Sequence, residues 1–444
     1  IYRRRELRQM IGAAGTTVLV TPSVYRGFDH AAMAADLTAE FPGLITMTIT
    51  DPTVEPDAFD TLLAAWPQAP DRPDRDAGEI SELLFSSGTE ATPKAIMHTE
   101  QTASFAVRTA GASLGVGEDD VVWMPSPIGH STGFNFGVRM ALEHGLPLVL
   151  QDRWDPQVAA ELVRAEGCTY TVAATTFLTD LVRHCETHGI ELTTLRLFGS
   201  GGAPVPAELV TAAQARGITV LRLYGSTEML VASWNRPESS FRKRRDTDGN
   251  ALDGVEIEIR DAQDLPVLGA TGEIVVRGPA CSVGFLGDPE RTARTYGADG
   301  WVRSGDLGVL DAEGYLTIVG RLKEIIIRGG MNVAPREVEE MIGALPGIAA
   351  VAVVGIPDER LGEIGCACVV LEPDAVVTLP WLVAQLKSAG LAGYKLPEML
   401  AVMSELPSTP SGKVQKHRLR VALSDPRATD RTLIVRVDDG RHRS

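Results

Sequence analysis

The sequence predicts an α/β protein: a large N-terminal domain with parallel α/β sheets and a small barrel-like β segment, followed by a small α+β C-terminal domain. Three observations support this prediction. Between residues 155 and 225, β-branched runs alternate with helical patterns, as strands and crossover helices do in a parallel sheet. After about residue 250, short strands and turns replace the long helices. A chain of 444 residues also exceeds what one core normally supports, so two or more domains are expected.

The alternating region can be followed element by element. Asp155 and Pro156 suit the N-cap and first turn of a helix. The expected order is helix 156–167, strand 168–176, helix 177–189, strand 195–198, helix 206–217 and strand 218–225. In an open sheet of this kind, ligands bind outside the carboxyl ends of the strands. Those ends carry the glycine- and hydroxyl-rich segments 199–204 and 224–228.

The rest of the chain has a different pattern of predicted secondary structure. Residues 254–279 alternate short β patterns with turns, which indicates an antiparallel or barrel-like segment. A boundary is expected near residues 320–325, giving domains 1–322 and 323–444. The second domain is expected to contain a helix beginning at Pro335, strands at 349–356 and 365–372, and a helix at 379–390. The polar stretch after Asp425 is expected to fray.

The charge balance limits the classes of ligand. The chain has 42 basic and 58 acidic residues, a formal net charge of −16. General binding to nucleic acid or to an anionic membrane needs a basic face, so neither is expected. No apolar run reaches the length of a transmembrane helix, and the first ten residues do not resemble a signal peptide. A cytoplasmic location is therefore expected.

The five cysteines, at positions 168, 185, 281, 366 and 368, show no CxxC pair and no ligand spacing with histidine. They are interpreted as buried free thiols in a reducing compartment. Cys366 and Cys368 alternate along one expected strand, so both side chains should face the same side of a sheet.

The run SSGTEATPK, residues 86–94, combines small hydroxyl residues with a glycine and a lysine. Converging N–H groups, hydroxyl donors and an ammonium are what a phosphate-binding loop offers. Glu90 argues in the other direction, and an ordinary solvated turn uses the same residue types. The run is not a Walker A loop, because no GK[ST] follows. The residues alone leave both interpretations open; Ser86, Ser87, Gly88, Thr89 and Lys94 are the candidates for phosphate binding.

Six motifs occur in order between residues 86 and 416: SSGTEATPK, GSGGAP, YGSTE, GWVRSGDLG, GRLKEIIIRGGMNVAPREVEE and PSTPSGKVQK. With these motifs the chain resembles the adenylate-forming superfamily, which includes acyl-coenzyme A ligases, peptide-synthetase adenylation domains and firefly luciferase. The resemblance implies a luciferase-like fold with a mobile C-terminal domain. It also implies ATP-dependent conversion of a carboxylate to an acyl-adenylate, from which a thiol displaces AMP. The segments RGFDHAAMA and MPSPIGHSTGF resemble ligases of short-chain, medium-chain or alicyclic acids, such as cyclohexanecarboxylate ligases.

The resemblance assigns the nucleotide site. Lys413 matches the catalytic lysine that bridges the carboxylate and the α-phosphate, whereas alone it would be taken for a solvated lysine in a turn. Asp306 matches the carboxylate that accepts the ribose hydroxyls, and Arg321 matches a cation that also reaches the ribose. The adenine slot is assigned to Tyr224 with Gly202, Ala203 and Pro204, although a lone tyrosine ending a strand can also be a core aromatic. The α-phosphate and magnesium site is assigned to Gly225, Ser226, Thr227 and Glu228.

The resemblance also implies roles outside the nucleotide site. Lys323 matches the hinge of the C-terminal domain, and Gly329 and Gly330 would let a pantetheine arm pass close to the backbone. His130 matches a histidine beside the acyl carboxylate, where relatives that activate amino acids carry an aspartate. The neighbouring Gly133, Phe134 and Phe136 suit either an apolar acyl pocket or an ordinary core. Lys416 is interpreted as a surface charge.

Two departures from the family pattern stand out. In the phosphate loop, Glu90 and Ala91 replace the usual Thr-Gly pair and Ala95 replaces a glycine; Glu90 would point to solvent or help to hold magnesium. Only 85 residues precede the loop, so the first part of the large domain is expected to be missing.

The function expected is that of an ATP- and Mg²⁺-dependent ligase that joins a small apolar carboxylic acid to coenzyme A. Two alternatives stay open: an enzyme that loads the acyl group onto a carrier protein, and a nucleotide-binding relative with impaired turnover. A homodimer is compatible with the sequence.

Overall fold

A computed structural model describes residues 2–49, 76–86, 94–409, 413–424 and 433–436. The chain forms two compact units, Ile1–Thr102 with Ser282–Arg294, and Ala103–Cys281 with Thr295–Ser444. The expected boundary between residues 322 and 323 falls within the second unit and stays a prediction.

The first unit contains three small sheets. Its elements are α1 (Arg4–Ala14), β1 (Val18–Pro22), β2 (Val24–Tyr25), β3 (Phe28–Asp29), α2 (His30–Glu40), β4 (Ile45–Ile49), β5 (Ile80–Ser86), β6 (Lys94–Thr99) and β16 (Gly284–Phe285). β1 and β4 are parallel, and β6 pairs antiparallel with β5 and β16. Ile11, Met33, Leu37 and Leu44 form a small core. Ser86 ends β5 and Lys94 begins β6, whereas residues 87–93 of the predicted phosphate loop lie outside the described residues.

The second unit contains the predicted parallel sheet. Its elements are β7 (Val122–Met124), α5 (Ser131–Gly133), the π-helix η1 (Phe134–Arg139), α6 (Met140–His144), β8 (Leu148–Leu150), α7 (Pro156–Ala165), β9 (Tyr170–Ala173), α8 (Thr175–His188), β10 (Leu197–Ser200), α9 (Ala207–Gln214), β11 (Val220–Tyr224), β12 (Ser233–Trp234), α10 (Phe241–Asp246) and β13 (Asn250–Ala251). The strand order is β13-β12-β11-β10-β9-β7-β8. The five strands from β8 to β11 are parallel, and β12 and β13 are antiparallel. The predicted alternation of strands and helices is confirmed.

Local chemistry sets the ends of these helices. The Asp155 carboxylate accepts from the N–H groups of Gln157 and Val158 and so caps α7. Gly189 ends α8 in the left-handed conformation, with φ of 63°, which glycine adopts without a steric penalty.

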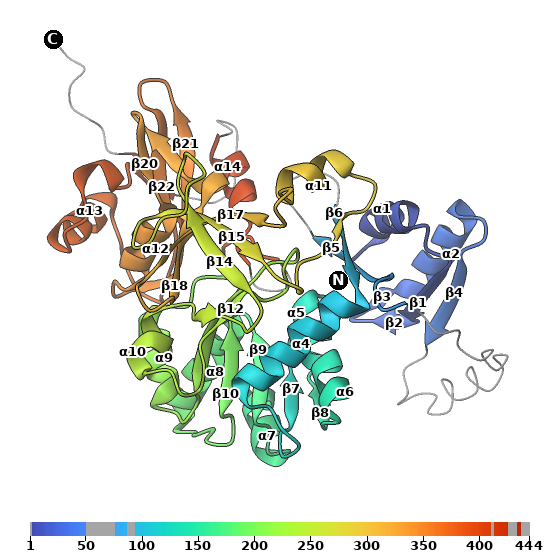
Figure 1. Ribbon diagram of the computed structural model, residues 1–444. Coiled ribbons are helices and arrows are strands. Elements are labelled where there is room, and N and C mark those ends of the chain that lie inside the picture. Colours follow the sequence, from blue (N-terminus) through green and yellow to red (C-terminus); the bar gives the residue numbers. More distant parts are fainter. Residues whose placement is uncertain (1, 50–75, 87–93, 410–412, 425–432, 437–444) are drawn as a thin grey trace, which may run out of the picture. The chain divides into compact units, whose positions relative to one another are not determined.

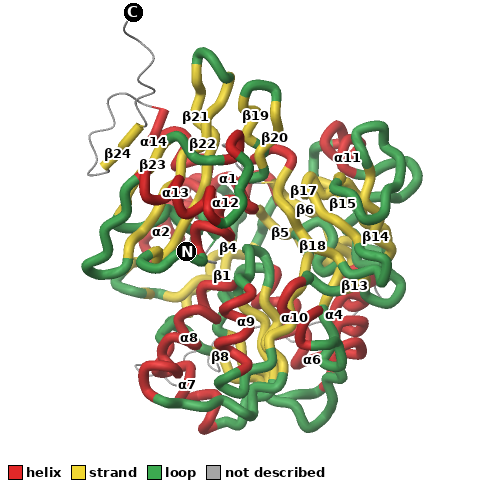
Figure 2. Tube along the Cα trace, turned by 90° about the vertical axis from the view of Figure 1, so that its left-hand side faces the viewer, coloured by secondary structure: helices red, strands yellow, loops and turns green. Residues whose placement is uncertain are grey.

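Helices cover both faces of the sheet. Figure 2 shows α7, α8 and α9 on one side of the strands and α4 (Glu100–Leu114) and α6 on the other. On the first side, Trp123 and Phe198 of the strands pack with Leu178, Leu181 and Val210 of the helices. Because both faces are buried, the strands carry apolar residues at almost every position.

An antiparallel sheet follows the parallel one along the chain. It consists of β14 (Glu256–Arg260), β15 (Gly272–Arg277), β17 (Val302–Leu310) and β18 (Leu316–Arg321), in that spatial order. α11 (Pro289–Thr295) lies between β15 and β17 in the sequence. The register of β17 and β18 places Asp306 opposite Arg321.

The last part of the chain is an α+β segment with a six-stranded sheet, drawn in orange and red in Figure 1. Its elements are the 3₁₀ turn η2 (Leu322–Glu324), β19 (Ile326–Arg328), β20 (Met331–Val333), α12 (Pro335–Gly343), β21 (Ile348–Asp358), β22 (Gly362–Leu371), α13 (Leu379–Ser388), the 3₁₀ turn η3 (Gly393–Lys395), β23 (Met399–Met403), α14 (Lys416–Ser424) and β24 (Leu433–Arg436). β24 pairs with β23. The expectation that the chain frays throughout after Asp425 is therefore wrong for this strand, whose backbone N–H and C=O groups extend the sheet edge.

The cysteine predictions are largely confirmed. All five thiols are free, and four are buried; Cys281 is only half-buried. Cys366 and Cys368 pack in one apolar cluster with Met399, whereas the intervening Ala367 packs in the cluster on the opposite face. Within the described ranges, none of the helices combines the length and apolarity that crossing a bilayer requires.

Candidate active site

Three predicted nucleotide-binding residues meet where β11 ends beside the antiparallel sheet. The Tyr224 hydroxyl donates to Asp306 Oδ2 at 2.9 Å, and Arg321 Nε lies 2.7 Å from Asp306 Oδ1. Tyr224 and Asp306 are 6% and 4% exposed. Burial, and then the negative charge of Asp306, raise the pKa of Tyr224 well above its usual value. The phenol therefore stays protonated and donates to the carboxylate.

A tight turn carries the predicted α-phosphate and magnesium residues. A Cβ atom on Gly225 would lie 2.0 Å from the Leu230 carbonyl oxygen, so only glycine lets the chain fold back here. Leu230 has φ of 53°, a conformation that costs a non-glycine residue about 1–3 kcal/mol. Within the turn, Ser226 Oγ donates to Glu228 Oε2 at 2.8 Å and accepts from the Glu228 N–H. The turn thus fixes the direction of the Glu228 carboxylate.

Lys413 lies beside these groups. Its backbone N–H donates to Thr409 Oγ1 at 3.1 Å and its carbonyl accepts from the Thr409 N–H at 2.8 Å. Burial, followed by repulsion from Arg321, lowers the pKa of the Lys413 ammonium to about 8, and nearby carboxylates oppose this shift. Lys413 keeps exposed surface, so water screens part of these effects. The opposing carboxylates are those of Asp306, Glu324 and Glu228.

His130 approaches the same region from the parallel sheet. It precedes α5, and its Nδ1 accepts from the Thr132 N–H at 3.2 Å. His130 keeps exposed surface, but desolvation by the groups packed around it, and then the charge of Lys413, lower the pKa of its imidazole. The neutral imidazole therefore carries its proton on Nε2, which is available as a hydrogen-bond donor.

The three residues that follow His130 in the acyl-pocket hypothesis have different environments. A Cβ atom on Gly133 would lie 2.3 Å from the Pro127 carbonyl oxygen, which gives this glycine a packing role. Phe136 is 5% exposed and packs edge-to-face on Trp234. Phe134 is 38% exposed and has the Arg139 guanidinium carbon 5.7 Å from its ring centroid; it alone of the three keeps accessible apolar surface. All three lie at or within the π-helix η1, a type of turn that often occurs at functional sites.

The remaining predicted residues are placed only by the elements that carry them, or lie outside what is described. Gly202, with φ of 76°, and its neighbours Ala203 and Pro204 form the loop after β10. Lys323 is exposed in η2, and Gly329 and Gly330, with φ of 56° and 81°, form the exposed turn between β19 and β20. Lys94 is half-buried in β6 of the first compact unit. The roles assigned to these residues stay predictions, as do those of Ser86, Ser87, Gly88, Thr89 and Thr227.

The interpretation of Lys416 as a surface charge is wrong. Its side chain is 19% exposed, and its Nζ lies 2.9 Å from Glu324 Oε2 and 2.8 Å from Glu339 Oε1. The sequence showed only a lysine in a polar turn, whereas both partners come from elements far away in the sequence.

The residues present fit a magnesium ion carried by a nucleotide. Magnesium at phosphate sites takes one or two carboxylates and completes its shell with phosphate oxygens and water. Glu228 offers such a carboxylate. In the part of the chain that the structure describes, no three or more His, Cys, Asp or Glu side chains gather as a self-sufficient metal site.

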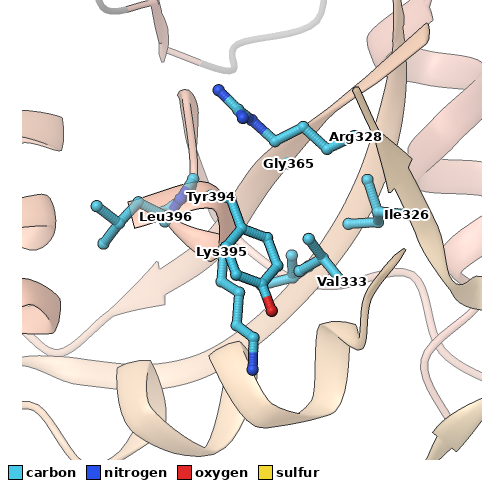
Figure 3. A pocket seen from close by; sticks show the side chains of 9 residues that line it. Ile326, Arg328, Val333, Gly365, Tyr394, Lys395 and Leu396 are labelled. Carbon is cyan, nitrogen blue, oxygen red and sulfur yellow. The ribbon is translucent and has the colours of Figure 1, made fainter. Parts of the chain in front are cut away.

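A separate small pocket lies in the C-terminal sheet (Figure 3), between β19, β20 and η3. Its cations already have partners: Arg328 pairs with Glu398 at 2.7 Å and Lys395 with Glu337 at 2.6 Å. None of the nucleotide-site residues lines it.

Comparison with known proteins identifies the family to which the chain belongs. The AMP-binding enzyme family matches residues 1–286, and the AMP-binding enzyme C-terminal domain matches residues 337–413. The medium-chain fatty-acid–CoA ligase of Escherichia coli (strain K12) is 41% identical over 347 residues, 77% of this chain and 61% of that protein. A ligase of Rhodococcus jostii (strain RHA1) that joins a methyl-dioxo-octahydroindenyl propanoyl group to CoA is 33% identical, over 94% of this chain and 82% of that protein.

Solved structures agree with the sequence relatives. ATP-bound MatB from Rhodopseudomonas palustris superposes with a TM-score of 0.84 at 29% identity, covering 96% of this chain and 82% of that one. The o-succinylbenzoate CoA synthetase of Bacillus subtilis, in complex with its acyl-adenylate intermediate, gives a TM-score of 0.79 at 25% identity, covering 96% and 81%. The predicted fold class and the predicted resemblance are confirmed: the chain belongs to the AMP-binding enzyme family, and its relatives are the adenylate-forming acyl-CoA ligases.

Proposed function

We propose that the protein is an AMP-forming acid–thiol ligase that converts an apolar carboxylic acid first to an acyl-adenylate and then to a thioester of coenzyme A. The observation that carries the proposal is the position of Lys413. The ammonium of Lys413 lies within electrostatic reach of Arg321, Asp306 and Glu228, which are the residues assigned to the ribose and the magnesium ion.

The first step requires electrostatic help, because an anionic carboxylate must approach an anionic nucleotide. One acid oxygen forms a bond to the α-phosphorus, the bond to the bridging oxygen breaks, and pyrophosphate leaves. Lys413 is placed to neutralise charge on both partners. His130 Nε2–H is placed to donate to the acid carboxylate, and the Glu228 carboxylate would hold Mg²⁺, which shields the phosphate oxygens. Asp306 and Arg321 orient the ribose.

The second step transfers the acyl group to a thiol. The sulfur forms a bond to the acyl carbon, AMP leaves as the acyl–oxygen bond breaks, and the thiol proton passes to solvent. We assign the turn at Gly329 and Gly330 to the path of the pantetheine arm and Lys323 to the hinge. The positive φ angles of both glycines permit a backbone that a ligand can approach closely.

Two sources support an apolar acid as substrate. The relatives' names include a medium-chain fatty acid and a propanoyl group on a fused ring, and Phe134 keeps accessible aromatic surface four residues after His130. The free thiols agree with a reducing, cytoplasmic compartment. The chain spans 61% of the length of the Escherichia coli relative. The activity of that relative is therefore not carried over to this chain, and activity has to be measured on the chain itself.

Pyrophosphate release from ATP tests the proposal, measured across linear, branched, alicyclic and aromatic acids with and without coenzyme A. We expect release with at least one apolar acid and formation of its thioester when coenzyme A is present. Thioester formation on a holo-carrier protein, but not on coenzyme A, would replace the proposed acceptor. ATP binding without pyrophosphate release for any acid would contradict the proposed activity.

A further inference from the structure

A partly buried ion cluster joins three elements of the C-terminal part of the chain. Lys416 Nζ, at the start of α14, contacts Glu324 Oε2 of η2 at 2.9 Å and Glu339 Oε1 of α12 at 2.8 Å. Glu339 Oε1 also accepts from the Val353 N–H of β21 at 2.6 Å. The exposed fractions of the three side chains are 19% for Lys416, 33% for Glu324 and 11% for Glu339. One ammonium thus ties α14 to a turn, a helix and, through Glu339, a strand.

Lys416 and Glu324 stay charged although both side chains are partly buried. Burial alone would lower the pKa of Lys416, but Glu339 and Glu324 together raise it. Burial would likewise raise the pKa of Glu324, but Lys416, Arg321 and Lys413 together lower it. A charged cluster of this kind strongly restricts the geometry of its members, because separating one ion leaves the others uncompensated in a poorly solvated place.

The position of the cluster in the chain suggests what it does. Glu324 directly follows Lys323, the residue assigned to the hinge, and Lys416 lies three residues after Lys413. The charge of Lys413 is also close enough to help lower the pKa of Glu324. The contact therefore connects the segment at the hinge to the segment that carries the reactive ammonium. Among the described residues, backbone hydrogen bonds also hold the segment before α14, from Thr409 to Lys413 and from Gln415 to Pro407, but these contacts do not join it to the hinge segment.

We propose that Lys416, held by Glu324 and Glu339, is a positioning residue for adenylation: it fixes the start of α14 to the hinge segment, so that Lys413 is delivered to the nucleotide in one orientation. This inference rests on the proposed function, and it gives Lys416 no contact with substrate. A displacement of about 1 Å in a reacting group can lower a rate by about 100-fold, so loosening the anchor affects the step that uses Lys413. Thioester formation from a supplied acyl-adenylate does not use Lys413 and is unaffected.

The test compares Lys416→Met with Lys416→Arg and with the control Arg418→Met, whose side chain is exposed on the same helix. For Lys416→Met we expect kcat for ATP–pyrophosphate exchange to fall about 10- to 100-fold, with KM for ATP and thioester formation from supplied acyl-adenylate within about twofold of the unsubstituted protein. Lys416→Arg keeps the charge and should recover most of the rate. Arg418→Met should leave both half-reactions unchanged.

A second variant separates positioning from folding. Lys416→Met combined with Glu324→Gln and Glu339→Gln removes the carboxylates left uncompensated by the first substitution. The thermal midpoint should recover in this triple variant while the exchange rate stays low. Full recovery of the exchange rate together with the midpoint would overturn the proposal, because stability alone would then explain the loss.

A readout that needs no turnover distinguishes failure of this inference from failure of the proposed function. The rate at which an amine reagent labels Lys413, followed by mass spectrometry across pH, reports the environment of that ammonium. Lys416→Met should move the pH midpoint of Lys413 labelling upward from about 8, because a loosened side chain is better solvated. If the Lys416→Met variant catalyses ATP–pyrophosphate exchange at the rate of the unsubstituted protein, the proposal is overturned. If the unsubstituted protein activates no acid, the labelling experiment decides: an unchanged pH midpoint of Lys413 labelling in Lys416→Met overturns the proposal.

Discussion

Arg222 and Asp248 form a buried ion pair, with Arg222 Nη2 2.7 Å from Asp248 Oδ1 and side chains only 6% and 7% exposed. The other Asp248 oxygen accepts from the Ile318 N–H of β18 at 2.9 Å. Arg222 lies on β11, two residues before Tyr224. The pair therefore ties the parallel sheet that carries Tyr224 to the antiparallel sheet that carries Asp306 and holds the two halves of the predicted ribose and adenine site in register.

Replacing Arg222 by methionine should destabilise the protein by about 3–5 kcal/mol, because Asp248 would remain as an uncompensated charge in the interior. Urea unfolding measures this change. Arg153→Met is the control, because Arg153 lies 3.8 Å from Asp152 in an exposed pair and such pairs contribute about 0–1 kcal/mol. Equal unfolding midpoints for Arg222→Met and Arg153→Met would show that the buried pair does not hold the sheets together.

Replacing Asp306 by asparagine should weaken ATP binding by about 10- to 100-fold, because a hydrogen bond to a charged group contributes about 1.5–3 kcal/mol. The carboxylate accepts from Tyr224 and Arg321 through different oxygens, and each oxygen keeps a second lone pair for a ribose hydroxyl. Titration calorimetry with ATP measures the loss. Asp264→Asn, at an exposed carboxylate paired with Arg303, should bind ATP normally; normal binding by Asp306→Asn as well would remove Asp306 from the nucleotide site.

Features that depend on neighbouring residues were predictable from the sequence. The Asp155 cap of α7, the glycine that ends α8 and the two faces of the strand containing Cys366 and Cys368 follow from short patterns, because the interacting atoms lie within a few residues of each other. The meeting of Tyr224 and Asp306, 82 residues apart, was expected only because their motifs resemble a known family.

Long-range ion pairs were not predictable. Lys416 meets Glu324 across 92 residues, and Arg222 meets Asp248 across 26. A lysine in the first turn of a helix gives the same local pattern whether it is solvated or paired, because its partner is decided by the packing of α12 and η2. β24 is a partial exception: its run Leu-Ile-Val-Arg has the β-branched composition of a strand, but so short a run forms a strand only where an existing edge offers N–H and C=O partners.

Replacing Lys413 by alanine should abolish adenylation far more than it slows thioester formation from supplied acyl-adenylate. The ammonium is assigned to the first step, in which negative charges converge, whereas the second step begins from an already activated acyl group. Pyrophosphate exchange and thioester formation, measured separately, test this difference. Lys387→Ala, in the last turn of α13, is the control for removal of a lysine. Equal losses in both half-reactions of Lys413→Ala would contradict the assigned role.

The same lysine should give adenylation an alkaline limit. A folded-state pKa of about 8, below the ordinary value of 10.5, means that the ammonium loses its proton as the pH rises through about 8, so kcat/KM for pyrophosphate exchange should fall above that pH. Between about pH 8 and 10.5 the unfolded chain binds more protons at this position than the folded one. The charged Lys413 destabilises the fold, and this destabilisation is relieved as the pH rises across this window. Bound ATP adds negative charge and stabilises the ammonium, so the limit in kcat should lie at a higher pH than the limit in kcat/KM. Lys413→Arg, which stays charged, should lack the alkaline limit at whatever rate it retains. An alkaline limit near pH 8 that persists in Lys413→Arg would assign the titration to a different group.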